Sequence, residues 1–178
     1  TFEDIVTHHA KHVLYERAVT EGSNWIVMRW QPRSPWRWFV TDPVAWFIHH
    51  PPSDLILFRE TPDTDGAGLD RFKRILIFAE PGPNDALVTH VADRFALTVA
   101  GAKLTFAHLL SAEADEAAED MVRSYHQGLR ELCSSDVGDA EVLRNDDELV
   151  ALLDFAKEFD LLILGAPAES EGSGVFRG

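Results

Sequence analysis

The side chains best suited to metal chemistry in this 178-residue sequence are histidines, which occur in two groups. His8 and His12 are one helical turn apart, so their imidazoles could share a metal ion on one face of a helix. His49 and His50 form the second group. A structural zinc site needs more than two protein ligands, and the first pair faces away from the apolar side of its helix with no cysteine near it. We therefore interpret these residues as solvated surface histidines and predict no metal site.

Covalent catalysis needs an activated nucleophile, and the sequence shows no motif that would supply one. Cys133 is the single cysteine, which excludes a disulfide within the chain, and its place after an apolar helical pattern indicates a small buried side chain. Carboxylates such as Asp146 and Asp147 are plentiful, but they have no Ser/His or Cys/His partner on a defined turn. Neither a nucleophile elbow nor a Walker A loop is present. We predict that the chain is not an enzyme.

Two turns that contain glycine offer places where the backbone could approach a ligand closely. The turn Glu80–Pro83 follows the apolar run Arg74–Phe78, and Gly165 follows the run Leu161–Leu164. Because glycine has no Cβ, it lets backbone N–H groups come close to an anion such as a phosphate. These two turns are therefore the candidate ligand-binding segments.

The apolar pattern predicts the strands and helices that carry these turns. Predicted strands are 25–28, 55–58, 74–78, 103–109, 141–143 and 161–164, and predicted helices are 2–21, 44–50, 85–100, 113–132 and 146–159. From residue 73 onward strands and helices alternate, which predicts an α/β fold with a doubly wound parallel sheet and helices on both faces. Ligands of such sheets bind beyond the carboxyl ends of the strands. We therefore expect the two glycine turns to lie beside each other on that edge.

Helical periodicity also predicts which side chains face the core. The main predicted stripes are Leu87, Val91 and Phe95 in one helix, Ala114, Ala118, Met121, Val122, Tyr125 and Leu129 in the next, and Leu149, Leu152, Leu153 and Ala156 in the last. His90 and His108 occur singly, and we interpret each as a core or surface residue rather than a ligand.

A polar segment rich in Gly and Pro divides the chain. Residues 61–72 are the predicted linker, because they show no apolar periodicity. The text NWIVM before the linker matches DLLIL near the end, and each follows a predicted helix. We therefore predict that 1–60 is the second half of a preceding repeat, and that 73–178 is a second copy that lacks its last helix and strand.

The strands that carry the two turns resemble those of the universal stress protein family. RILIFAEPGP, residues 74–83, is similar to the family's first strand, an Ile-Leu-Val run followed by Val-Asp-Gly-Ser-Pro. FDLLILGAPAE, residues 159–169, resembles its fourth strand entering a glycine-rich phosphate loop. The resemblance covers about the whole of 71–178, and 1–60 resembles the second half of another copy. It implies the universal-stress-protein architecture, which is of the adenine nucleotide alpha hydrolase-like type.

The resemblance also implies an adenine-nucleotide site for ATP or AMP. Its residues would be Glu80, Gly82, Gly165 and Gly178. Glu80 stands where the family has an aspartate on the ribose or base side. Ala168 replaces the second loop glycine, and Glu169 and Glu171 add negative charge where phosphates would lie. These changes predict a degraded site in which the nucleotide binds weakly or not at all, or a plain flexible loop.

The composition is strongly acidic, with a formal net charge of −14. Such a surface repels nucleic-acid phosphates, so we predict no nucleic-acid partner. Few lysines with abundant Asp and Glu suit a salt-loving organism, and a plain soluble acidic protein is the other interpretation. All five tryptophans lie between Trp25 and Trp46, together with several arginines. This pattern predicts a contact surface for a homo-oligomer or a tandem repeat, with a membrane-facing loop as the alternative.

Paired stress-protein domains occur as cytoplasmic tails of amino-acid transporters in the amino acid–polyamine–organocation superfamily. The turn AEPGP, the acidic composition, the half-repeat and the absence of a starting Met are similar to such a tail. Residues 1–11 contain charges and histidines where a signal peptide would be apolar, and no stretch approaches the roughly 20 apolar residues of a membrane span. The resemblance therefore implies a cytoplasmic regulatory domain, either free or attached to a transporter. A ligand-free dimerisation or interaction scaffold is the alternative function.

Overall fold

The computed structural model describes residues 6, 9–30, 43–59, 68–138 and 140–165. By its internal contacts the chain divides into two compact units, residues 1–66 and 67–178, and each is described by itself. The division falls inside the predicted linker 61–72. The end of that segment is ordered, however, because Leu69–Arg71 form a 3-10 turn (η3) and Phe72 is buried against Phe95.

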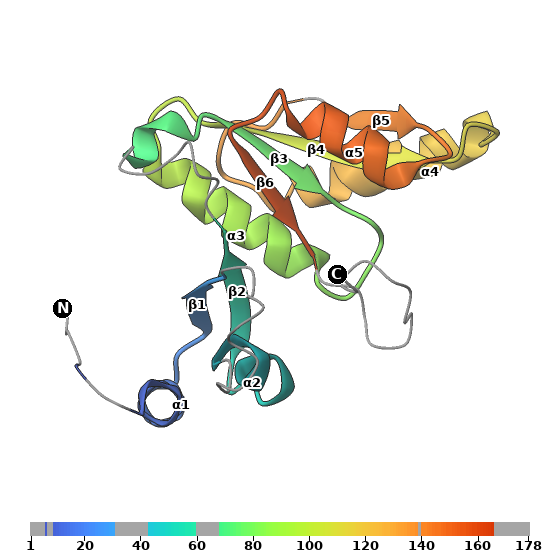
Figure 1. The fold of residues 1–178 in the computed structure, drawn as a ribbon. Helices are drawn as coiled ribbons and strands as arrows, with labels where there is room; N and C mark the ends of the chain where they lie inside the picture. The colour runs from blue at the N-terminus through green and yellow to red at the C-terminus, as the bar shows by residue number, and fades with distance from the viewer. Residues whose placement is uncertain (1–5, 7–8, 31–42, 60–67, 139, 166–178) are drawn as a thin grey trace. The chain divides into compact units, whose positions relative to one another are not determined.

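The first unit is a parallel pair of strands with two helices. Its elements are α1 (Ala10–Glu21), β1 (Trp25–Arg29), α2 (Pro43–His49) and β2 (Asp54–Phe58) (Figure 1). Its core gathers around Ala18, Ile26 and Phe47, which join both helices to one face of the strands. The predicted helix start at residue 2 is wrong for the described residues: α1 begins at Ala10, and Val6 lies outside it and is fully exposed.

The second unit is a four-stranded sheet in which every pair of neighbours is parallel. Its elements are β3 (Arg74–Phe78), α3 (Asp85–Thr98), β4 (Lys103–Leu110), α4 (Glu116–Arg130), β5 (Glu141–Arg144), α5 (Glu148–Ala156) and β6 (Leu161–Leu164). The strand order is β5-β4-β3-β6. The doubly wound parallel sheet predicted from the alternation of strands and helices is therefore confirmed.

Helices cover both faces of this sheet (Figure 1). Ile75 and Ile77 of β3 pack in one cluster that also holds residues of α3 and α4. Leu76, which points to the other face, packs in a second cluster with Leu152 of α5. The side chains of β3 are thus buried on both sides, which explains why a strand of this kind reads as one continuous apolar run.

The helix faces agree with the predicted stripes only in part: Val122, Leu129 and Leu152 are buried as predicted. In α3 the buried face is polar as well as apolar: its members are Asp85, Val88, Thr89, Ala92, Asp93 and Ala96. Leu87, Val91 and Phe95, which were predicted to face the core, are only partly buried and lie at the margin of this face. In α4, Met121 is 74% exposed, so its predicted place in the core is wrong. Leu149 and Leu153 of α5 are likewise 60% and 52% exposed.

None of the helices among the described residues is long and apolar enough to cross a membrane.

Candidate functional site

The two glycine turns lie side by side at the carboxyl edge of the sheet. Phe78 and Leu164, the last residues of β3 and β6, are register partners on adjacent parallel strands. The turn after β3 and Gly165 after β6 therefore leave the sheet at the same edge. A Cβ placed on Gly165 would be 3.8 Å from the Cβ of Asn84, which closes the first turn. The fourth predicted residue, Gly178, lies outside the described residues.

The fold itself does not require glycine at either turn. Gly82 and Gly165 have ordinary backbone angles, since the glycines with positive φ among the described residues are Gly22 and Gly101. A Cβ on Gly82 would meet the Glu80 carbonyl oxygen at 3.4 Å, which is an ordinary contact. Glu80 is exposed. The steric role of these glycines is therefore limited to leaving room at the edge.

Asp85, at the start of α3, fixes the first turn. Its carboxylate accepts a hydrogen bond from the Gly82 amide at 2.7 Å and another from the Tyr125 hydroxyl of α4. Asp85 itself is buried. Burial, the hydrogen bond to Asp85 and the charge of Asp85 all raise the pKa of Tyr125, so the phenol stays protonated and continues to donate. Asn84, the residue before α3, forms no side-chain cap, and the Asp85 carboxylate accepts from Gly82 within the turn rather than from an amide of the helix.

Two buried histidines lie beneath the same turn. His108 of β4 places its Nδ1 2.8 Å from the carbonyl oxygen of Ala79. Because a carbonyl can only accept, His108 Nδ1 carries the proton. His126 of α4 is wholly buried, with its ring centroid 5.9 Å from that of His108, and neither of its ring nitrogens has a hydrogen-bond partner. Burial, then the charge of His108, lowers the pKa of His126 to about 4.

Asp85, Tyr125 and His126 belong to this edge although the sequence pattern does not predict them there. One signal was available: Asp85, Thr89 and Asp93 recur every four residues on α3, a spacing that puts polar groups on one helix face. The partners of Asp85 and Asp93 lie some forty residues further along the chain, in and after α4. A single sequence gives no means of finding those partners.

Near the start of α3, α4 and α5, a side-chain carboxylate accepts a hydrogen bond from a backbone amide. Asp85 accepts from Gly82 in the turn before α3. Asp115 accepts from the Ala118 amide at 2.9 Å in α4, and Asp147 accepts from the Val150 amide at 3.2 Å in α5. A helix N-terminus attracts anions through backbone amides that have no partner within the helix. Here the protein's own carboxylates already satisfy part of that attraction.

The basic group next to this edge is also engaged. Arg144, the last residue of β5, donates to Glu119 at 2.7 Å and to the Ala114 carbonyl oxygen at 2.7 Å. The hydrogen bonds from Arg144 and Arg123 lower the pKa of Glu119. Further carboxylates near this edge are exposed: those of Glu80, Glu113 and Asp146. The edge is therefore acidic, with its arginine paired.

The histidines of the first unit have aromatic neighbours. His12 and His50 both contact Trp46, with ring centroids 6.1 Å and 5.1 Å away. His8 lies outside the described residues. No group of three or more His, Cys, Asp or Glu residues in the described part of the chain could hold a metal ion. Cys133 is half-buried, and burial followed by the charge of Asp93 raises the pKa of its thiol to about 11, so it is a poor nucleophile.

These features define the second unit as a doubly wound parallel α/β domain with an acidic carboxyl edge. No protein-family model matches the chain, and no curated protein matches it. Among solved structures it is similar to the universal stress protein UspA from Lactobacillus plantarum, with 18% identity over 58% of this chain and 84% of that one and a TM-score of 0.44. It is also similar to protein Rv1636 from Mycobacterium tuberculosis H37Rv, with 19% identity over 62% and 84% and a TM-score of 0.45. At these values the likeness concerns the course of the backbone alone.

Proposed function

We propose that this chain is a regulatory or sensory domain of the universal-stress-protein type whose carboxyl edge has lost tight binding of adenine nucleotides. The observation that carries this proposal is the state of the amides and charges at that edge. Gly82 donates to Asp85, and the starts of α4 and α5 donate to Asp115 and Asp147. A phosphate would have to displace these carboxylates or lie beside them.

Electrostatics points the same way. Two like unit charges 4 Å apart near a protein surface repel each other by ~4 kcal/mol at an effective dielectric constant of about 20. The carboxylate of Asp85 is buried and accepts two hydrogen bonds, so it cannot turn away from a phosphate without breaking both. We expect ATP, with more charge, to bind less well than AMP. Any remaining ligand would act by shifting the packing of the domain against its partner.

A thermal and chemical unfolding assay tests the loss of nucleotide binding. A ligand that binds only the folded state stabilises it by about 0.4 kcal/mol when its concentration equals the Kd, and by ~2.7 kcal/mol at 100 times the Kd. We expect less than ~0.5 kcal/mol from about 5 mM ATP. Stabilisation above ~2.7 kcal/mol at that concentration would overturn the proposal, because the Kd would then be below about 50 μM.

Charge variants show whether the carboxylates are the cause. Asp85→Asn removes the buried charge and leaves an oxygen that can still accept from Gly82, so ATP should bind more tightly than to the unchanged protein. Asp136→Asn is the matched control, because Asp136 is exposed and its carbonyl joins the amino end of β4 at the opposite edge. Equal ATP binding by both variants would mean that Asp85 does not weaken the site.

A ligand-free dimerisation or interaction scaffold is the second candidate function. Leu149, Val150 and Leu153 of α5 are 60%, 49% and 52% exposed, an unusual outer face for a helix of a soluble domain. Light scattering of the unchanged protein and of a Leu149→Lys, Leu153→Lys variant tests this function. An oligomer that the variant converts to monomer supports the scaffold. A monomeric unchanged protein at high concentration argues against it.

We propose further that the domain is cytoplasmic and is the tail of an amino-acid transporter, on the strength of the turn AEPGP and the acidic composition. Reading the coding sequence upstream of Thr1 tests this directly. Membrane-spanning helices encoded there would support the attachment, and their absence from the complete reading frame would refute it.

A further inference from the structure

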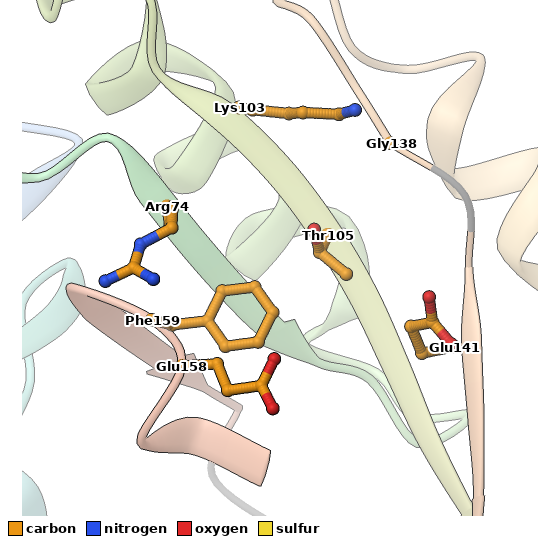
Figure 2. A pocket seen from close by; sticks show the side chains of 7 residues that line it. All are labelled: Arg74, Lys103, Thr105, Gly138, Glu141, Glu158 and Phe159. Atoms are coloured by element: carbon orange, nitrogen blue, oxygen red, sulfur yellow. The ribbon is translucent and has the colours of Figure 1, made fainter.

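A pocket of about 350 Å³ opens at the amino edge of the sheet, opposite the acidic carboxyl edge (Figure 2). Arg74 and Lys103 begin β3 and β4 and are register partners, so they lie side by side on its floor. Thr105, two residues further along β4, faces the same way. The turn after α5 contributes Glu158 and Phe159 on one side. The pocket thus lies on the face of the sheet that α5 covers, just beyond the end of that helix.

The charges in this pocket are of both signs, and most are unpaired. Arg74 is the exception: its guanidinium bonds to Asp160 at 2.9 Å, which raises the pKa of Arg74. The side chains of Lys103 and Glu141 form no ion pair or hydrogen bond with any described residue, and Glu158 forms no direct ion pair among them. Elsewhere in the described part of the chain, Arg17, Arg123, Arg144 and Lys157 are all paired with acids.

The backbone of Gly138 makes room for the lysine. A Cβ at this buried position would lie 2.9 Å from Lys103 Cε and 3.3 Å from the Leu104 carbonyl oxygen. Because position 138 is a glycine, the Lys103 side chain can extend from β4 across this wall of the pocket, past Gly138 (Figure 2). Any larger residue would push the ammonium group aside.

We propose that this pocket binds a small zwitterion, with its carboxylate on Lys103, its ammonium group on Glu141 or Glu158, and its carbon chain against the ring of Phe159. The inference is independent of the proposed function, since it uses the opposite edge of the sheet. A simple anion would gain Lys103 but meet two carboxylates. A simple cation would gain a carboxylate but leave the charge of Lys103 without a partner, whereas Arg74 is already paired with Asp160. The volume is at the lower end of the range of small-molecule sites, which suits a ligand of few atoms.

Small-molecule probes distinguish binding of a zwitterion from binding of a ligand that carries only one charge. Glycine, 4-aminobutyrate and 6-aminohexanoate vary the distance between the charges, while butyrate and n-butylammonium each carry only one of them. Backbone amide shifts from NMR titration of the full chain report the binding. We expect at least one zwitterion to shift Lys103, Thr105 and Phe159, and to bind about tenfold or more tightly than either singly charged probe, because a hydrogen bond to a charged group adds that much.

Variants tie the binding to the pocket. Lys103→Met removes the carboxylate partner, and Gly138→Ala displaces the same ammonium group while keeping its charge; both should weaken the zwitterion about tenfold. Lys157→Met is the control, since Lys157 is exposed and paired with Asp154 outside the pocket. Binding that survives Lys103→Met, or equal binding of the zwitterions and butyrate, would overturn the proposal. So would the absence of amide shifts with every probe.

Discussion

Replacing His126 with phenylalanine should make the second unit less sensitive to acid. His126 is wholly buried between the rings of Phe106 and His108, with centroids 5.8 Å and 5.9 Å away, and its nitrogens have no hydrogen-bond partner. Burial first, and the charge of His108 second, lower the pKa of His126 from 6.5 to about 4. The ring is therefore neutral in the folded protein at neutral pH, and protonating it opposes the fold.

The sign and size of the effect follow from this shift. Because the folded pKa lies below the unfolded one, the unfolded chain takes up the proton first as pH falls. Stability is unaffected above about pH 7, decreases between about 6.5 and 4, and changes no further below. A shift from 6.5 to about 4 corresponds to ~3 kcal/mol over the whole range, at ~1.4 kcal/mol per pH unit. At neutral pH the variant should also gain about 1 kcal/mol, because it no longer buries two unsatisfied nitrogens.

The tryptophans make a clean assay possible. All five lie within residues 25–46, so tryptophan fluorescence reports on the first unit and far-UV circular dichroism also follows the second. Urea unfolding would be measured at pH 7.5, 6 and 5 for the unchanged protein and the variant. His90→Phe, at an exposed position of α3, is the control. If His126→Phe and the unchanged protein lost the same stability between pH 7.5 and 5, the assignment of a low pKa to a buried neutral His126 would be wrong.

Three further substitutions test other contacts by urea unfolding at neutral pH. Asp93→Ala should lower the free energy of unfolding by ~3 kcal/mol. The buried carboxylate accepts from two backbone amides and the Ser135 hydroxyl after α4, and these three donors would lose their partner. A loss below about 0.5 kcal/mol would contradict this. Since hydrogen bonds from Ser135 and Ser134 outweigh burial and lower the pKa of Asp93, its contribution should persist down to about pH 4 and fade below it. Tyr125→Phe should cost ~1.5 kcal/mol through the lost bond to Asp85, and an unchanged midpoint would show that this bond is weak. Met121→Lys, at a 74% exposed position, should change stability by less than about 0.5 kcal/mol, and a larger loss would mean that the side chain is buried in solution.

The sheet could be predicted from the sequence because its strands have a local signal. Arg74–Phe78 and Leu161–Leu164 are short apolar runs with a charge or a turn at each end, and the structure has strands at those residues. Alternation with helices then restricts the topology to a parallel sheet, and this restriction places the two turns together. The edge where ligands would bind therefore followed from pattern alone.

The buried polar face of α3 could not be predicted in the same way. Charged residues are seldom buried, so the pattern predicts an apolar stripe through Leu87 and Val91 and gives no buried place to Asp85 or Asp93. Burial of the two aspartates depends on donors far along the chain, Tyr125 for the first and the residues after α4 for the second. The small side chain of Ala92, on the same side of α3, lies in the core cluster. Local periodicity carries no information about partners of this kind.

The buried face of α5 was predicted wrongly for the opposite reason. It is apolar almost all round, so its periodicity does not single out one face, and Leu149 and Leu153 were assigned to the core. Among the described side chains of α5 only Leu152 is buried, against the face of the sheet that holds Leu76. A helix of this composition normally has a second covering. The described part of the chain does not supply it, which is why the scaffold function is tested at these leucines.

The two edges of the sheet differ in what a ligand would have to displace. At the carboxyl edge the donors near Gly82 are already bonded to carboxylates, so an anion must break a charge-assisted hydrogen bond before it can form one. At the amino edge Lys103 and Glu141 have no such bonds to break, and a ligand carrying both charges exchanges only water. The usual expectation for this fold puts the ligand at the carboxyl edge. Here the pairing of charges, rather than the topology, favours the other edge, and a zwitterion that shifted Glu80 and Gly165 instead of Lys103 would show that topology still decides.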